Sequence, residues 1–239
     1  MRRATLTSVA GGCAVLTTAC FVVGIVLMAV GGVQVLIPET GQDGLDWIAD
    51  VDDAGGLFAG GAWLVVFGGV FALVALVGFY ETLRDAHHAL ILAPVLAVVG
   101  MVFVTISHAV PIALSYEFVP GYVDATGAAR EALQVSFDTW AVTCLVFNYV
   151  GDALLWGVVV PAYAWASLAT RAVPRWIGWV GIVTGVVAGW LGLFAPASSV
   201  IDGVTFIGFV AFFVWMTAMG VALLRRPRAA DKAPIPALG

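Results

Sequence analysis

The stretch WAVTCLVFNYVGDALLWGVVVPAYAWA, residues 140–166, decides the fold. Its one charged residue is Asp152, and an amide residue, Asn148, lies one helical turn earlier. Such a run predicts a bilayer-crossing helix, because about 20 apolar residues cover about 30 Å of hydrocarbon. A carboxylate near the centre of that helix costs several kcal/mol unless it is paired, protonated or hydrated. Asp152 is therefore the first candidate functional residue.

The composition of the whole chain agrees with this conclusion. Of the 239 residues, 62% are hydrophobic and 10% are charged, whereas soluble domains carry about 25% charged residues. Residues 1–226 are expected to form an all-α integral membrane bundle, and residues 227–239 a disordered cytoplasmic tail. The six predicted transmembrane helices cover approximately residues 9–37, 54–83, 89–114, 139–168, 176–194 and 204–224.

The basic residues predict the orientation of the bundle. Nine of the ten fall on one side of the predicted membrane and Arg130 falls on the other. By the positive-inside rule, both termini are expected in the cytoplasm of a multi-pass protein of the cell membrane. The basic residues are few, and their positions follow the membrane topology, which argues against nucleic-acid binding. The nine are Arg2, Arg3, Arg84, Arg171, Arg175, Arg225, Arg226, Arg228 and Lys232.

Polar residues of the fourth helix form one stripe. At about 100° per residue, five of them fall within an arc of roughly 80°: Arg130, Gln134, Asp138, Asn148 and Asp152. Nothing breaks the helical pattern before Thr139, so this helix is expected to begin near Ala128, outside the membrane. A polar stripe that faced lipid would be costly, so we expect it to face the bundle interior or an outward-facing water-filled cleft.

The third helix offers partners for this stripe. Thr105, His108 and Ser115 fall toward one face, and His108 is expected nearer in depth to Asp138 than to Asp152. An aspartate with a histidine at similar depth can hold or relay a proton, because histidine titrates near neutral pH. The same residues also suit interhelical hydrogen bonds worth about 0.6 to 2 kcal/mol each, which only hold helices together. Both interpretations stay open at this point.

No metal centre or cofactor is predicted. His87 and His88 lie about 30 Å along one helix from His108, at 1.5 Å per residue. The outer loop at residues 39–53 carries six carboxylates. It is expected to be a solvated acidic surface; binding of a divalent cation is the alternative, although the loop lacks EF-hand spacing.

Glycines recur at four-residue spacing on the fifth helix, at Gly181, Gly185 and Gly189. Small residues let helix backbones approach closely, so this row predicts a tightly packed partner helix, in the same chain or in another.

Two segments near the C-terminus resemble a known family. These are PRWIGWVGIVTGV at residues 174–186 and LLRR at residues 223–226, at the end of the last span. Together with the six-span plan they are similar to the bacterial membrane family catalogued as domain of unknown function 4386. The resemblance implies a multi-pass inner-membrane protein and supplies no catalytic residues for this chain.

Three functional hypotheses follow. The first is a bundle that binds or moves a small molecule or a proton through an outward-facing cleft lined by Asp138, Asn148, Asp152 and His108. The second is a membrane-embedded enzyme acting on a lipid or isoprenoid, with one of the two aspartates as general acid and His108 as base. The third is a scaffold or sensor subunit that binds its partner through the glycine row.

Overall fold

The computed structural model describes residues 2–34 and 36–225, which contain helices and no strand. Six helical segments in this part of the chain are long and apolar enough to cross a membrane: Leu6–Val30, Gly56–Ala86, His88–Asp124, Ala128–Thr170, Arg175–Ala195 and Gly203–Leu224. The predicted all-α bundle of six membrane-spanning helices is confirmed. The tail predicted at 227–239 lies outside the described residues.

Eight elements make up the chain as far as the end of the third span. Their bounds are α1 (Arg2–Val30), α2 (Gly41–Ala54), α3 (Gly56–Leu83), η1 (Arg84–Ala86), η2 (His88–Ile91), α4 (Leu92–Ala113), the π-helical turn η3 (Leu114–Phe118) and α5 (Val119–Asp124), and the fourth span begins with α6 (Ala128–Leu154). The remainder are the π-helical turn η4 (Leu155–Val159), α7 (Val160–Thr170), α8 (Arg175–Thr184), the π-helical turn η5 (Gly185–Trp190), η6 (Leu191–Ala197) and α9 (Ser199–Leu224).

The helix ends correct several predicted boundaries. The first span was expected to reach residue 37, but α1 ends at Val30. Gly31 and Gly32 follow, and Gly32 has φ +91°, a conformation that favours glycine and stops a right-handed helix. The third span continues to Asp124 instead of ending near residue 114. The fourth helix begins at Ala128, as its unbroken pattern predicted.

The acidic segment before α3 is a helix, α2, where a loop was expected. Trp47, Ile48 and Val51 are buried on its inner face, whereas its aspartates are exposed. Apolar residues three and four apart are typical of an amphipathic helix, and the density of carboxylates hid this pattern. The acidic surface is therefore solvated, but its carboxylates belong to a helix and not to a loop.

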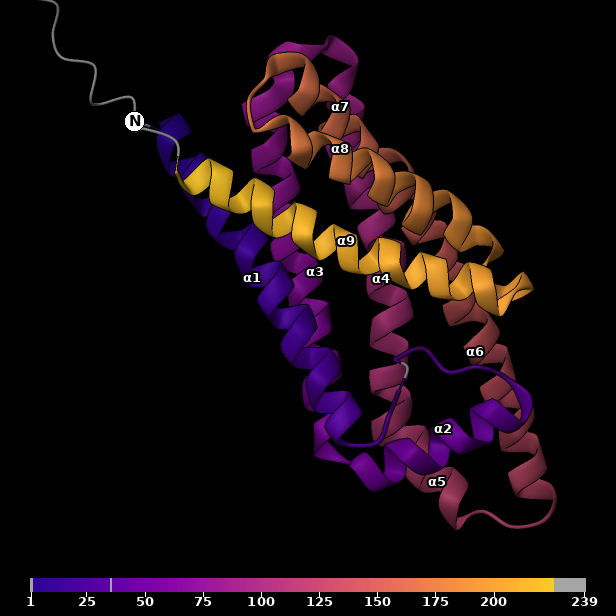
Figure 1. Ribbon diagram of the computed structural model, residues 1–239. Coiled ribbons are helices and arrows are strands. Elements are labelled where there is room, and N and C mark those ends of the chain that lie inside the picture. Colours follow the sequence, from indigo (N-terminus) through magenta and orange to yellow (C-terminus); the bar gives the residue numbers. More distant parts are fainter. Residues whose placement is uncertain (1, 35, 226–239) are drawn as a thin grey trace, which may run out of the picture.

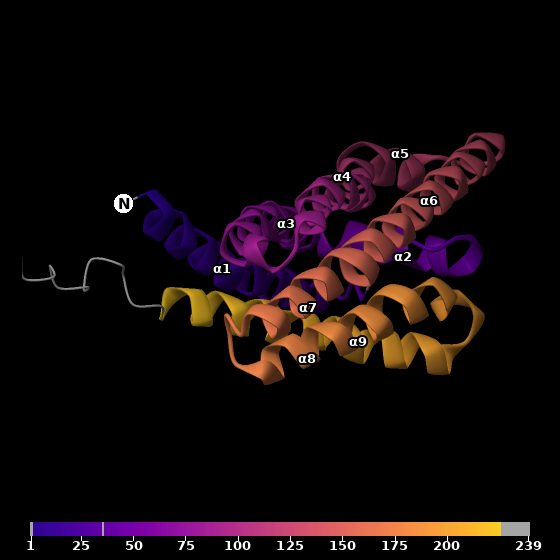
Figure 2. The same cartoon turned by 90° about the horizontal axis from the view of Figure 1, so that it is seen from above.

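The two ends of the bundle differ in character. Figure 1 shows the start of α1 and the end of α9 at one end, together with the turns that join α3 to α4 and α7 to α8. We call this the basic end, because Arg84, Arg171, Arg175 and Arg225 lie there. The opposite end, the α2 end, holds α2 and α5. Seen from above in Figure 2, α8 and α9 lie together along one side of the bundle.

Close backbone contact holds α4 against α6. A Cβ atom added to Gly151 would lie 2.6 Å from Cγ2 of Val104 and 2.9 Å from the carbonyl oxygen of Gly100. Only a glycine permits this separation, as is usual where membrane helices cross closely. The crossing fixes the register of the two helices next to Asp152.

Candidate functional site

The carboxylate of Asp152 accepts two hydrogen bonds from side chains of its own helix. Nδ2 of Asn148 donates to Oδ2 at 2.8 Å, and Nε1 of Trp156 donates to Oδ1 at 2.6 Å. These donors lie one turn before and one turn after the aspartate, where i and i+4 side chains meet. Both carboxylate oxygens are therefore held in place.

Asp152 lies at the middle depth of the bundle. Its neighbour Gly151 contacts Gly100, which is near the middle of α4. Trp156 contacts Phe212, near the middle of α9, with 3.8 Å between ring centroids and an interplanar angle of 85°. These contacts place the carboxylate near the centre of the membrane-spanning bundle, where we expected it.

The helix widens immediately after Asp152 because of a proline. Pro161 has no N–H group to donate to the carbonyl four residues earlier, which belongs to Gly157, and the turn η4 is π-helical there. Nε1 of Trp190 donates to that free carbonyl oxygen at 3.0 Å. A side chain from η5 thus satisfies the backbone group that the proline leaves open, as membrane proteins require.

Ser107 of α4 extends the polar cluster across the helix crossing. Its Oγ lies 3.4 Å from Oδ1 of Asn148 and donates to the carbonyl oxygen of Val104 at 2.8 Å. The sequence analysis did not select Ser107. Gly100, Val104 and Ser107 lie on one face of α4, at i, i+4 and i+7. This spacing could have indicated Ser107 as a site residue only if the face of α4 that contacts α6 had been known. We call Ser107, Asn148, Asp152 and Trp156 the Asp152 cluster.

No cation faces this carboxylate within the described part of the chain. The ion pair found there joins Arg84 to Glu81 at the basic end. The partners of Asp152 are a neutral amide and a neutral indole. A carboxylate held only by neutral donors within a membrane-spanning bundle retains the electrostatic cost that a salt bridge would offset.

Asp138, the second aspartate of the stripe, has a different role. Its Oδ1 accepts a hydrogen bond from the backbone nitrogen of Gly41, at 3.2 Å. Gly41 is the first residue of α2, where unpaired N–H groups and the helix dipole favour an anion. Asp138 therefore anchors α2, and at 1.5 Å per residue it lies about 21 Å along the helix from Asp152.

The outer part of the stripe belongs to the same α2 layer. The guanidinium of Arg130 lies 4.7 Å from the centre of the Tyr122 ring. Phe137 contacts Trp47 and Phe118, with ring centroids 5.8 Å and 5.7 Å apart. Gln134, between Arg130 and Phe137 in this layer, makes no hydrogen bond that the described residues show.

His108 and Thr105 do not join the Asp152 cluster by a hydrogen bond within the described residues. Because α4 and α6 run antiparallel, the contact between Ser107 and Asn148 places His108 opposite about residue 147, about 8 Å along the helix from Asp152 and about 14 Å from Asp138. The expectation that His108 lies nearer in depth to Asp138 is therefore wrong. Helix register could not be read from one sequence, and the prediction assumed the wrong alignment of α4 with α6.

The glycine row of α8 and η5 packs inside the same chain. A Cβ on Gly181 would lie 2.5 Å from Nε1 of Trp215 in α9, and one on Gly185 would overlap Pro161. A Cβ on Gly189 would overlap Gly157 of η4. Another protein would have to bind through other surfaces.

Among the described residues, no group of three or more His, Cys, Asp or Glu side chains is arranged to hold a metal ion. The carboxylates of α2 point to solvent from one exposed face. The fold and the Asp152 cluster together describe a multi-pass membrane protein with a polar cluster inside its helical bundle. Comparisons with protein-family models, curated proteins and solved structures find no match to this chain.

Proposed function

We propose that the protein binds or moves a proton or a small molecule across the cell membrane, with Asp152 as the group that takes up and releases the proton. The observation that carries this proposal is the Asp152 carboxylate itself. It lies at the middle depth of the bundle and is held by neutral donors from Asn148 and Trp156. Ionisable groups in such positions mark proton and substrate pathways in membrane proteins.

The amide of Asn148 suits a carboxyl group that changes its protonation state. When Asp152 is ionised, the amide N–H₂ group donates to it, which is the observed arrangement. When Asp152 is protonated, its O–H group can donate to the amide oxygen after the amide rotates. Ser107 can follow this rotation because its hydroxyl has a second acceptor in the Val104 carbonyl.

The direction of the polar cluster supports an opening toward the α2 end. Asn148 and Ser107 lie on the α2 side of Asp152, whereas Trp156 covers it toward the basic end. Trp156 in turn packs against Phe209 and Phe212 of α9, with centroid distances of 5.6 Å and 3.8 Å. We infer that the basic end is cytoplasmic, by the positive-inside rule, and that the site opens outward.

The enzyme and scaffold hypotheses have less support. General acid–base catalysis needs two groups within hydrogen-bond reach of one substrate, and His108 makes no hydrogen bond with Asp152. The glycine row proposed as a scaffold surface is covered by the same chain.

The experiment is a proton-flux measurement in liposomes that hold the purified protein and a pH-sensitive dye. A potassium gradient with valinomycin drives protons inward. We expect the wild-type protein to acidify the lumen faster than protein-free liposomes do, and Asp152→Asn to lower the rate to that background.

Asp46→Asn is the matched control. Oδ1 of Asp46 accepts a hydrogen bond from Nε2 of Gln42, four residues earlier, at 2.7 Å. This pair repeats the Asn148–Asp152 arrangement on the exposed surface of α2. The Asp46→Asn variant should therefore acidify the lumen at the wild-type rate. A wild-type rate at background, or an Asp152→Asn rate equal to that of the wild type, would contradict the proposal.

A further inference from the structure

A long apolar groove runs along α9 and is separate from the Asp152 cluster. Its volume is about 980 Å³, at the upper end of ligand-binding clefts. Nine residues of α9 between Phe206 and Ala222 line it, together with Arg225, which follows the helix; α1 forms one border and the start of α8 another. At 1.5 Å per residue the stretch from Phe206 to Arg225 is about 28 Å long, close to the hydrocarbon thickness of a bilayer.

The inside of the groove suits hydrocarbon. Its two threonines satisfy one another, since Oγ1 of Thr217 donates to Oγ1 of Thr18 at 2.9 Å. The Thr18 hydroxyl then lies 3.4 Å from the carbonyl oxygen of Phe213. No polar solute is needed to pair these hydroxyls, and the other side chains along the middle of the groove are apolar.

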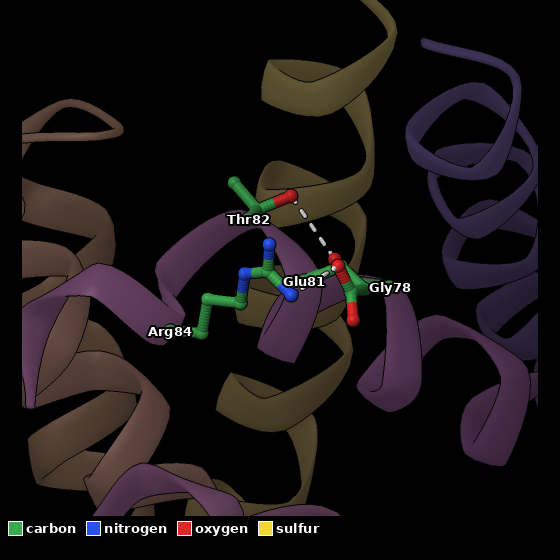
Figure 3. Close-up of polar contacts among 4 residues, drawn as sticks. All are labelled: Gly78, Glu81, Thr82 and Arg84. Atoms are coloured by element: carbon green, nitrogen blue, oxygen red, sulfur yellow. Dashed lines mark hydrogen bonds and ion pairs between the residues drawn. The ribbon is translucent and has the colours of Figure 1, made fainter. Parts of the chain in front are cut away.

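The basic end of the groove carries a positive charge. Arg225 lines the groove and is exposed, and it forms no ion pair with any described residue. Arg84 at the same end differs, because its Nη1 lies 3.3 Å from Oε2 of Glu81. Figure 3 shows these two side chains next to one another. Trp176, 53% exposed, lines the same part of the groove, and tryptophan favours the lipid headgroup level.

From these features we propose that the groove binds an anionic phospholipid from the leaflet at the basic end. The phosphate lies at Arg225, and an acyl chain follows α9 inward past Ala218. The charge of Arg225 selects the headgroup, and the apolar wall holds the chain. This inference does not depend on the role of Asp152.

Native mass spectrometry of protein released from lipid nanodiscs tests the proposal. The nanodiscs contain equal amounts of phosphatidylglycerol and phosphatidylcholine with the same acyl chains. We expect the wild-type protein to retain phosphatidylglycerol about fivefold over phosphatidylcholine, as one arginine at a lipid surface implies. Arg225→Glu should remove this preference, and Arg130→Glu, at the α2 end, should keep it.

A second pair of variants locates the acyl chain. Ala218→Trp fills the groove and should lower the retention of both lipids severalfold. Ala162→Trp introduces the same ring on α7, at a partly buried position outside the groove, and should leave retention unchanged. A thermal melt of each variant confirms that it is folded. Equal retention of the two lipids by the wild type, or wild-type retention by Arg225→Glu or Ala218→Trp, would overturn the proposal.

Discussion

The fourth span holds two aspartates in two environments, although both lie on one helical stripe. Asp138 accepts a backbone N–H from the first residue of α2, at the α2 end of the bundle. Asp152 accepts side-chain N–H groups from Asn148 and Trp156 at the middle depth of the bundle. The same residue type thus anchors a helix at one position and, in our proposal, carries a proton at the other. The surrounding helices, and not the stripe, decide which role applies.

The two regions are also packed by different means. In the α2 layer, aromatic rings fill the space, and Trp47 meets Phe58 edge to face with centroids 5.5 Å apart. Around Asp152, helix backbones touch at glycines such as Gly151 and Gly189. Substitutions in the second region should therefore be more harmful than substitutions in the first, because a backbone cannot move aside as a side chain can.

The largest effect is expected from Gly189→Ala. The added methyl group would overlap the backbone nitrogen and Cα of Gly157, and overpacking of this kind costs about 3 kcal/mol. Unfolding in mixed detergent micelles, followed by circular dichroism, measures the loss. Gly60→Ala is the control, because a Cβ at Gly60 meets nothing within 4 Å. Equal stability of the two variants would refute the close approach of η4 and η5.

Trp156→Phe should have the next largest effect. It removes a hydrogen bond to a carboxylate, for which a loss of about 2 kcal/mol is expected. Trp190→Phe makes the same chemical change at a bond to the neutral Gly157 carbonyl, and about 1 kcal/mol is expected there. The same unfolding assay compares them. A larger loss of stability in Trp190→Phe than in Trp156→Phe would contradict the hydrogen bond between Trp156 and Asp152.

Asp138→Ala should act locally. Loss of the anion at the start of α2 costs about 1 kcal/mol, so hydrogen exchange of the α2 amides should become faster while exchange in α4 and α9 stays the same. Ser136→Ala, two residues earlier, is the control, since its hydroxyl bonds only the Ala132 carbonyl of its own helix. Unchanged exchange in α2 would show that Asp138 does not anchor it.

The smallest effect is expected from Arg130→Gln. The guanidinium lies over an aromatic ring near the surface, where such contacts contribute about 0.5 kcal/mol. Stability should fall slightly, and the fall should be smaller than that of Asp138→Ala. A larger loss would indicate that Arg130 has a partner besides Tyr122.

The spans and the extended fourth helix could be predicted from sequence, because length and hydrophobicity alone determine which segments cross a bilayer. Helix α2 was missed because five aspartates among its 14 residues obscure the apolar residues that face the core. The end of α1 was placed too late because the apolar run continues past Gly31 and Gly32, and only the backbone conformation at Gly32 shows where the helix stops.

Part of the site was also readable in advance. Asn148 and Asp152 are four residues apart, so their contact follows from helix geometry; the same spacing links Asp152 to Trp156, which the sequence analysis did not select. Ser107 and the depth of His108 depend on how α4 is aligned with α6. That alignment is set by the contact of Gly100 with Gly151, which a single sequence does not reveal.

Infrared difference spectroscopy of the reconstituted protein across an acid–base step tests most directly whether Asp152 exchanges a proton. One component of the protonated-carboxyl C=O band should be present in the wild type and in Asp46→Asn, and absent in Asp152→Asn. The same component should shift in Trp156→Phe and not in Trp190→Phe. Identical carboxyl bands in the wild type and Asp152→Asn would contradict a proton-exchanging role for Asp152.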